Sequence, residues 1–465
     1  MSEPPDSSRR AVTPPTPADF GLHVGVLGPV ETLAQSVSTI APSGSPSLLI
    51  PVIFALAGNA TWFVFLLATG ATLLVGFCVS RFARLSASPG SLYTYTVASL
   101  PPLFGAAAGW GLLLAYVAGA MSAGGGAIYF AGILAQEFLH TGIPDLLTLA
   151  VVCGATAWIA HRDITLSAEL MLWIEVASVT VILVVLSLVP IRFGFHFDMD
   201  QLKLKGAPTS ALGPALVLAM LSFTGFESAT TLGVEARDPL RTIPRVVLQS
   251  AVLSGVFFMV CSYCEVLGFR GEASKLSDST SPLHLLATRG GVAPLGMVAD
   301  LGAMLSMFAC VLASITAAAR VSMRLAAAGL LPRAFADTSP RHGTPGVAIF
   351  ASVGILFAAT VAMIIHGWGG SEILDLAGSL AVFGYLTAYT LAAVALPFAL
   401  RTASQFSLGV VALSVATVAA MIAIVVYDLL SATDPAHARI PYLFLAYLAA
   451  GLAWSLAKPR RRLES

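Results

Sequence analysis

Small and polar residues interrupt two of the chain's long apolar runs, and we expect binding chemistry at these interruptions. The first run contains Ala41-Pro42-Ser43-Gly44-Ser45-Pro46, and the second contains Phe223-Thr224-Gly225-Phe226-Glu227. Two prolines around a glycine remove backbone donors and prevent a continuous helix in the first run. An unpaired peptide group costs several kcal/mol in hydrocarbon, so each interruption must be enclosed by protein or line a watered cavity.

The unpaired peptide groups of the two interruptions suit the two charged ends of a zwitterion. Free amides at residues 43–45 would begin a half-helix whose positive dipole end attracts a carboxylate. Carbonyl groups near residues 223–224 would accept hydrogen bonds from an ammonium group. A structural kink is the alternative for either interruption alone. Two interruptions at matching positions of two five-helix halves favour a transporter site.

Aromatic and sulfur-containing side chains are candidates for the walls of this site. Phe223 and Phe226 could contact the substrate, and Tyr116 and Met121 in the third apolar run could face them. Simple packing is the alternative for each of these four. The candidate substrate-binding residues are Ala41, Ser43, Gly44, Ser45, Tyr116, Met121, Phe223, Thr224, Gly225, Phe226 and Glu227.

Glu175 and Glu227 are among the carboxylates inside apolar runs, where each costs roughly 2.5–3.5 kcal/mol on insertion scales and therefore needs a role. Glu175 could carry a proton, because a low dielectric favours the neutral carboxyl, or bind sodium beside Ser314 and the backbone of the first span. A structural carboxyl bonded to backbone is the third interpretation of Glu175. Glu227 is expected to bond free amides at its interruption, with pairing to a cationic substrate as the alternative.

A charged cluster follows the second interruption. It consists of Glu235, Arg237, Asp238 and Arg241, and we interpret it as a cytoplasmic gate. An ordinary solvated loop is the alternative, since exposed ion pairs contribute little.

Composition identifies lipid as the solvent for these elements. The 465 residues are 57% hydrophobic and 10% charged, with a mean hydropathy of +0.87. A soluble domain carries roughly 25% charged residues, and a net charge of zero gives no sign of a nucleic-acid partner. Runs long enough to cross a bilayer fall at about 29–57, 61–82, 97–135, 144–160, 165–190, 211–234, 243–269, 292–326, 345–366, 371–398, 405–430 and 437–457.

The distribution of basic residues sets the expected orientation. With both termini cytoplasmic, most of the 24 lysine and arginine residues fall on the inside. The Ser281-Pro282 pair in the external segment 277–290 signals a short helix, either a lid or an ordinary interfacial helix. The expected organisation is a disordered tail at 1–26, a first repeat at 27–190, an external loop at 191–210, a second repeat at 211–400, two further spans at 401–457 and a basic tail at 458–465.

Other motifs give no sign of an enzyme or of a metal centre. Cys261 and Cys264 form a CxxC, but they lie in a membrane run where packing is the favoured role. The eight histidines show no HExxH spacing, and there is no GxSxG nucleophile motif. Glycines such as those at 124–126 are expected to let helices approach closely.

The second interruption and the segment after it resemble the amino acid–polyamine–organocation (APC) superfamily. Residues 223–227, followed by 234–245 (VEARDPLRTIPR), match its acidic segment after a broken sixth helix. Residues 88–93, 109–110 and 319–345 agree with further family motifs in order. The resemblance implies an all-α membrane protein with a five-plus-five inverted repeat (LeuT-like fold), broken helices one and six, and substrate held between spans one, three, six and eight.

The expected function is therefore secondary transport of an amino acid or a small amine by alternating access, in a bacterial inner membrane. Coupling to protons is expected in preference to sodium, with no cofactor, bound metal or obligate protein partner. A polyamine or organic-cation transporter or exchanger is the alternative within transport. A channel or an intramembrane enzyme is the alternative of a different class, and neither has a motif here.

Overall fold

A computed structural model describes residues 21–193, 197–271, 275–431 and 436–457. Over these residues the chain is almost entirely helical, and the only strand-like pairing described is one bridge between Leu27 and Ala236. The first half contains α1 (Pro29–Ile40), α2 (Ile50–Ala57), α3 (Thr61–Ala83), α4 (Ser91–Val97), α5 (Pro102–Leu139), α6 (Asp145–Arg162) and α7 (Ile164–Phe193).

The second half repeats this order after a short helix on the predicted external side, α8 (Met199–Leu202). It contains α9 (Leu212–Leu221), α10 (Pro239–Gly268), α11 (Pro282–Arg289), α12 (Ala293–Ala327), α13 (Gly346–Ile365) and α14 (Gly370–Thr402). The last two helices are α15 (Leu408–Ser431) and α16 (Ile440–Ala457).

Each of the twelve apolar runs corresponds to a span of the structure. Among the described residues, nine helical segments are long and apolar enough to cross a membrane. One of them, residues 29–83, holds the first two spans, and α6 and the interrupted α9 supply the two that fall outside this criterion. The all-helical membrane architecture expected from composition is confirmed.

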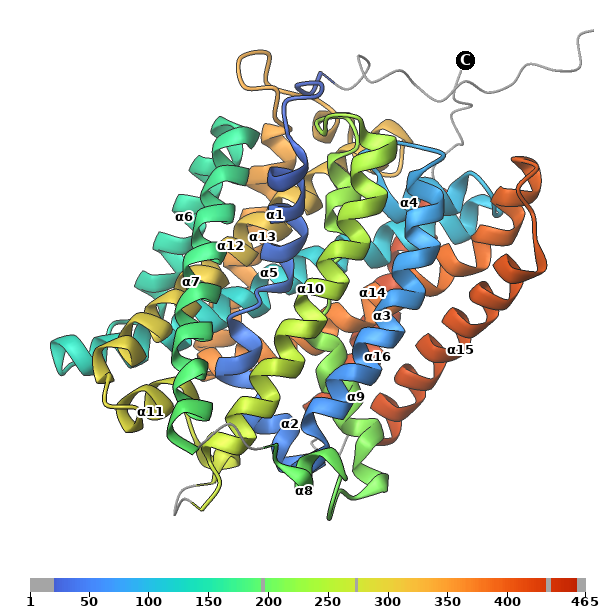
Figure 1. The fold of residues 1–465 in the computed structure, drawn as a ribbon. Coiled ribbons are helices and arrows are strands. Elements are labelled where there is room, and N and C mark those ends of the chain that lie inside the picture. The colour runs from blue at the N-terminus through green and yellow to red at the C-terminus, as the bar shows by residue number, and fades with distance from the viewer. Residues whose placement is uncertain (1–20, 194–196, 272–274, 432–435, 458–465) are drawn as a thin grey trace, which may run out of the picture.

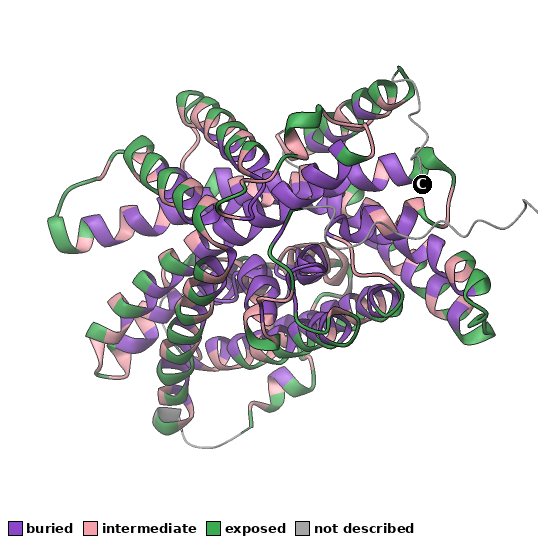
Figure 2. Ribbon diagram, turned by 90° about the horizontal axis from the view of Figure 1, so that it is seen from above, coloured by how far each residue is buried: buried purple, intermediate pink, exposed green. Residues whose placement is uncertain are grey.

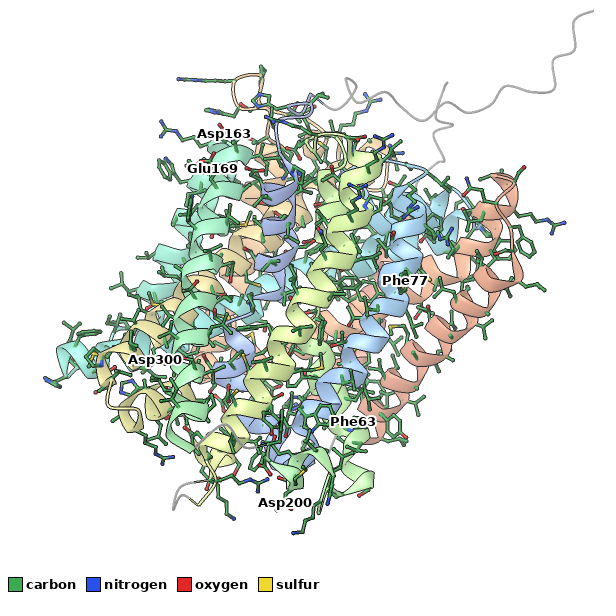
Figure 3. The ribbon with its side chains drawn as sticks, viewed as in Figure 1. Phe63, Phe77, Asp163, Glu169, Asp200 and Asp300 are labelled. Atoms are coloured by element: carbon green, nitrogen blue, oxygen red, sulfur yellow. The ribbon has the colours of Figure 1, made fainter. Side chains whose placement is uncertain are left out.

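The helices form one bundle whose long axes run broadly together (Figure 1). Asp163 and Glu169 lie at one end, the predicted cytoplasmic side, and Asp200 lies at the other (Figure 3). Buried residues gather in the middle and exposed residues on the outer faces (Figure 2). Many exposed side chains are large and apolar, such as Trp173 (69% exposed) and Val151 (62%), which suits a surface covered by lipid.

Both predicted interruptions are present, each within its span. Helix α1 ends at Ile40, Ala41 takes a left-handed conformation (φ 50°), and a π-helix at Ser45–Leu49 then leads into α2. Helix α9 ends at Leu221, and after a turn a 3-10 helix covers Ser228–Leu232. In Figure 1 the first of these breaks lies between α7 and α10.

The centre of the bundle is built on α5 and α14, whose backbones approach closely. A Cβ atom on Gly125 would lie 2.7 Å from the carbonyl oxygen of Gly370, and a Cβ on Gly370 would lie 2.6 Å from that of Gly125. This contact confirms that the 124–126 glycines allow close packing.

The predicted N-terminal tail is only partly covered by the structure. Residues 1–20 and the C-terminal tail at 458–465 lie outside the described residues. Residues 21–26 pack against the bundle, because Leu22 is buried with Val234 and Met323. The structured part therefore begins several residues before the expected boundary at residue 27.

Candidate functional site

A cavity of about 60 Å³ lies between the two broken spans. Its walls come from the first and sixth spans and from α5, α12 and α14. These include all four spans implied by the resemblance, because α5 is the third span and α12 is the eighth. Helix α14 is an addition to that set. The lining residues are Thr39, Ile40, Ala41, Gly44, Ser45, Leu48, Leu49, Gly119, Ser122, Ala123, Leu221, Ser222, Thr224, Met307, Cys310, Ser314, Leu374 and Tyr385.

Four of the candidate substrate-binding residues line this cavity, namely Ala41, Gly44, Ser45 and Thr224. The Gly44 amide already donates to the Ala41 carbonyl at 2.9 Å, so it is less available than the sequence suggested. The first-turn amides of a helix have no partner in their own helix; in the π-helix they include those of Ser45 and Ser47, while Pro46 has no amide hydrogen. In the described structure the buried Ser222 hydroxyl also has no hydrogen-bond partner, which suits a polar ligand.

The other candidates lie outside the cavity wall. Phe223 and Phe226 line a second, smaller pocket with Tyr389, and Met121 packs among apolar side chains. Ser43 is fully buried beside the break and its carbonyl accepts a hydrogen bond from the Ser47 hydroxyl at 2.9 Å.

Gly225 shapes the second break by letting the two broken spans touch. Its φ is +80°, a conformation that side chains with a Cβ rarely adopt. A Cβ there would lie 2.2 Å from Cγ2 of Thr39 and 3.1 Å from the hydroxyl oxygen of Tyr385. Only glycine fits this contact, so Gly225 acts through the backbone.

Glu227 is held between two tyrosines of other spans. The Tyr116 hydroxyl donates to Oε1 of Glu227 at 2.9 Å, and the Tyr389 hydroxyl donates to Oε2. The carboxyl is fully buried, and the Tyr389 hydroxyl also accepts from the Gly225 amide at 3.4 Å. Glu227 therefore has a structural bonding role, as favoured from the sequence, but its partners are hydroxyl groups of α5 and α14.

A polar network that the sequence analysis did not identify joins the two breaks. The Thr39 hydroxyl lies 2.8 Å from the Ser228 hydroxyl, and the Ser36 hydroxyl accepts from the Ala229 amide at 3.1 Å. Gln35 donates to the Ala313 carbonyl of α12 at 2.9 Å. The available signal was the spacing of Gln35 and Thr39, four residues apart on one face of an apolar helix.

Glu175 lies where α7 meets α12. The Ser306 hydroxyl contacts both of its carboxylate oxygens, at 3.0 and 2.9 Å, and the side chain is 4% exposed. Ser314 lies on the cavity wall instead, two helical turns away along α12. Eight residues of helix span about 12 Å, so the structure does not bring Glu175 and Ser314 together.

The candidate gate divides into a buried part and an exposed part. Glu235 forms a two-pronged ion pair with Arg320 of α12, with both N–O distances 2.6 Å and at most 2% of either side chain exposed. Asp238 and Arg241 form a 3.7 Å pair at the surface. Arg237 donates through its amide to the Leu27 carbonyl at 2.8 Å, so the chain preceding α1 is fastened to this segment.

Comparison with known proteins agrees with this architecture. The sequence pattern of the family described as amino acid permease matches residues 27–452. The chain is 23% identical to the branched-chain amino acid permease BcaP of Bacillus subtilis, over 73% of each chain. It is 26% identical to the low-affinity putrescine importer PlaP of Escherichia coli, over 69% of each.

Solved structures show the same fold at lower identity. The manganese transporter of Eremococcus coleocola superposes with a TM-score of 0.62 and 11% identity, covering 94% of this chain and 97% of that one. MhsT in complex with L-phenylalanine superposes with a TM-score of 0.54 and 17% identity, covering 88% and 99%.

Proposed function

Because this chain belongs to the amino acid permease family, we propose that it carries a small neutral amino acid across a bacterial inner membrane by alternating access, driven by protons. The observation that carries the proposal is the central cavity, which lies between two unwound backbone segments and has no charged side chain among its lining residues. The excess of basic residues on one side supports cytoplasmic termini.

The charge of the cavity favours a zwitterion. A carboxylate and an ammonium group bring a net charge of zero, and peptide groups and hydroxyls can bind both ends. A polyamine would need carboxylates in the wall, and the carboxylate predicted for this role from the sequence, Glu227, is already bonded to Tyr116 and Tyr389. These contacts favour an amino acid over the polyamine alternative, although PlaP is a relative named for putrescine.

The size of the cavity favours a small side chain. A single water molecule needs roughly 10–15 Å³ of such space, so about 60 Å³ holds only a few groups of that size. Met307, Leu374 and Leu48 are among the apolar residues of the wall. Glycine, alanine and serine fit this description better than aromatic amino acids do.

Glu175 is the proposed proton carrier. It is a buried carboxyl with two short contacts to a single hydroxyl, at the junction of α7, α12 and the first span. Burial in a low dielectric favours the neutral form, so the group can hold a proton and release it when water reaches it.

The substrate is tested by protection of Cys310, a native cysteine in the cavity wall. In a variant that keeps Cys310 as its only cysteine, alanine or serine is expected to slow alkylation by N-ethylmaleimide, and putrescine is not. Protection by putrescine alone would overturn the neutral-substrate proposal. Uptake of the protecting amino acid into proteoliposomes, abolished by an ionophore, would then establish active transport.

The coupling role is tested with Glu175→Gln against Glu169→Gln, an exposed glutamate of the same helix. Glu175→Gln is expected to abolish uptake driven by a pH gradient while sparing protection of Cys310, and Glu169→Gln is expected to change neither. Gradient-driven uptake at the wild-type rate in Glu175→Gln would refute the role of Glu175.

A further inference from the structure

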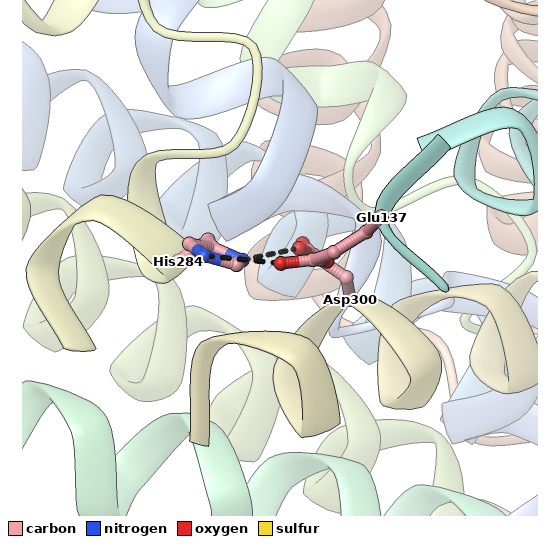
Figure 4. Close-up of side chains that lie close together, drawn as sticks. All are labelled: Glu137, His284 and Asp300. Carbon is pink, nitrogen blue, oxygen red and sulfur yellow. Dashed lines mark hydrogen bonds and ion pairs between the residues drawn. The ribbon is translucent and has the colours of Figure 1, made fainter. Parts of the chain in front are cut away.

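Three side chains from three different helices meet at a place that the transport mechanism does not use. Glu137 lies near the end of α5, His284 lies in the short helix α11, and Asp300 lies in α12 (Figure 4). Nδ1 of His284 is 3.2 Å from Oδ2 of Asp300, and its Nε2 is 3.4 Å from Oε1 of Glu137. One nitrogen or oxygen atom from each residue lies within 4.8 Å of the others.

The cluster has two carboxyl groups and a single imidazole to pair with them. In the described part of the chain neither carboxylate has a lysine or arginine partner. Asp300 is 1% exposed, and the second oxygen of Glu137 is buried without a hydrogen-bond partner. A divalent cation would balance the two carboxylates.

Neighbouring groups hold the ligands in place. The Ser281 hydroxyl, at the start of α11, donates to Oδ1 of Asp300 at 2.6 Å and leaves Oδ2 for another partner. The Tyr129 hydroxyl of α5 donates to the Thr280 carbonyl at 2.9 Å, which fixes the adjacent turn. Such hydrogen bonds behind the ligands are typical of metal sites, where they orient the carboxylates.

We propose that Glu137, His284 and Asp300 form a binding site for a divalent transition-metal ion, best suited to Zn²⁺, on the predicted external side of the bundle. One imidazole and two carboxylates are a donor set that Zn²⁺ accepts, and the imidazole disfavours Ca²⁺ and Mg²⁺. Ligand atoms around tetrahedral Zn²⁺ are roughly 3.4 Å apart, so side-chain shifts of about 1 Å suffice from the present spacing. Glu137 and His284 are 21% and 26% exposed, which leaves access for the ion and for a water ligand.

The position of this site gives the metal a consequence for transport. It joins α11 to α5 and α12, and both of these long helices contribute to the central cavity through residues such as Ser122 and Cys310. A bound ion would cross-link α11 to α5 and α12 and restrict their relative movement. Zn²⁺ is therefore expected to slow the exchange between the two accessible states and to inhibit uptake reversibly.

The test is isothermal titration of ZnCl₂ into the purified, chelator-treated full chain. The wild type is expected to bind one ion per chain, and His284→Ala and Glu137→Gln are each expected to weaken binding at least about tenfold. His366→Ala is the matched control, because His366 is an exposed histidine on the same predicted side and makes an edge-to-face contact with Trp368. It should bind as the wild type does.

The absence of Zn²⁺ binding at micromolar concentrations, or unchanged binding in His284→Ala, would overturn the site. Each variant is first compared with the wild type in melting temperature and gel-filtration profile. Glu137 lies at the partly exposed end of α5, so Glu137→Gln keeps the test decisive if His284→Ala fails to fold. Preferential binding of Ca²⁺ over Zn²⁺ would also contradict the proposed chemistry.

Discussion

The buried pair between Glu235 and Arg320 provides the sharpest test of how the predicted cytoplasmic side is closed. Glu235 follows the sixth span and Arg320 lies in α12, so the pair links the segment after the sixth span to α12. We expect Arg320→Met and Glu235→Leu each to open this side, because each leaves one unpaired charge in the protein interior. Water can solvate that charge only if the segment that carries residue 235 moves away from α12.

The structure sets the size of the effect. Both contacts are 2.6 Å and both side chains are almost fully buried, so solvent screening removes little of their interaction. Breaking one side of such a pair costs about 3–5 kcal/mol. Each 1.4 kcal/mol is about a factor of ten in an equilibrium, so the closed state should lose roughly a hundredfold or more in population relative to the open one.

The assay uses Cys310, which lines the central cavity, as the only cysteine of the chain. Inside-out membrane vesicles expose the predicted cytoplasmic side to a charged, membrane-impermeant thiosulfonate. Labelling of Cys310 is expected to be much faster in each single variant than in the parent. The double variant Glu235→Leu/Arg320→Met, which leaves no unpaired charge, should return toward the parent rate.

Two results would refute this reasoning. Labelling at the parent rate in both single variants would show that the pair does not close the cavity. A double variant that labels as fast as the sum of the single effects predicts would show that the two residues act independently. Asp238→Asn is the control, since its pair with Arg241 is largely exposed and should have little influence.

Two further predictions concern the break and the external loop. Gly225→Ala should abolish uptake, because the added Cβ would lie 2.2 Å from Thr39. Gly154→Ala is the control and should transport normally, because no atom lies within 4 Å of the Cβ it would add. Wild-type uptake in Gly225→Ala would contradict the close contact between the two broken spans. Burial alone would raise the pKa of Asp198, but hydrogen bonds from Gln201 and Arg270 outweigh it and lower that pKa. A lowered pKa stabilises the folded state above the ordinary carboxyl value, and this stabilisation is lost as pH falls through the folded pKa. The melting temperature of Asp198→Asn should therefore lie below that of the wild type near neutral pH, and the gap should close in acid; a gap that does not depend on pH would be inconsistent with this role.

The spans and their interruptions could be predicted because both depend on local sequence. Twenty apolar residues suffice to identify a span, and Pro42, Pro46 and Gly225 act on their own backbone. The predicted breaks at residues 41–46 and 223–227 match Ala41 and Gly225, which have positive φ angles. Lipid strengthens these signals, since hydrocarbon offers a free peptide group no hydrogen-bond partner.

The partners of the buried polar groups could not be predicted from one sequence. Glu235 and Arg320 are 85 residues apart, and Glu175 and Ser306 are 131 apart. Their meeting depends on how each helix is rotated about its axis, which apolar runs with weak periodicity do not specify. The Tyr385 and Tyr389 pair in α14 was a usable signal, because two hydroxyls four residues apart mark one polar face of a membrane helix.

A short segment of chain runs from the second break to the candidate gate, and we expect it to connect substrate binding to closure. Residues 225–235 begin at the glycine that touches Thr39, continue through Ser228 in the polar network, and end at Glu235 on Arg320. A solute that draws the two breaks together therefore acts on a segment anchored to α12 at its far end. Linkage requires the effect to be mutual: if substrate favours the closed gate, then variants that open the gate must weaken substrate binding by the same factor. Substrate protection of Cys310 that is equally strong with and without the Glu235–Arg320 pair would mean that this segment does not couple them.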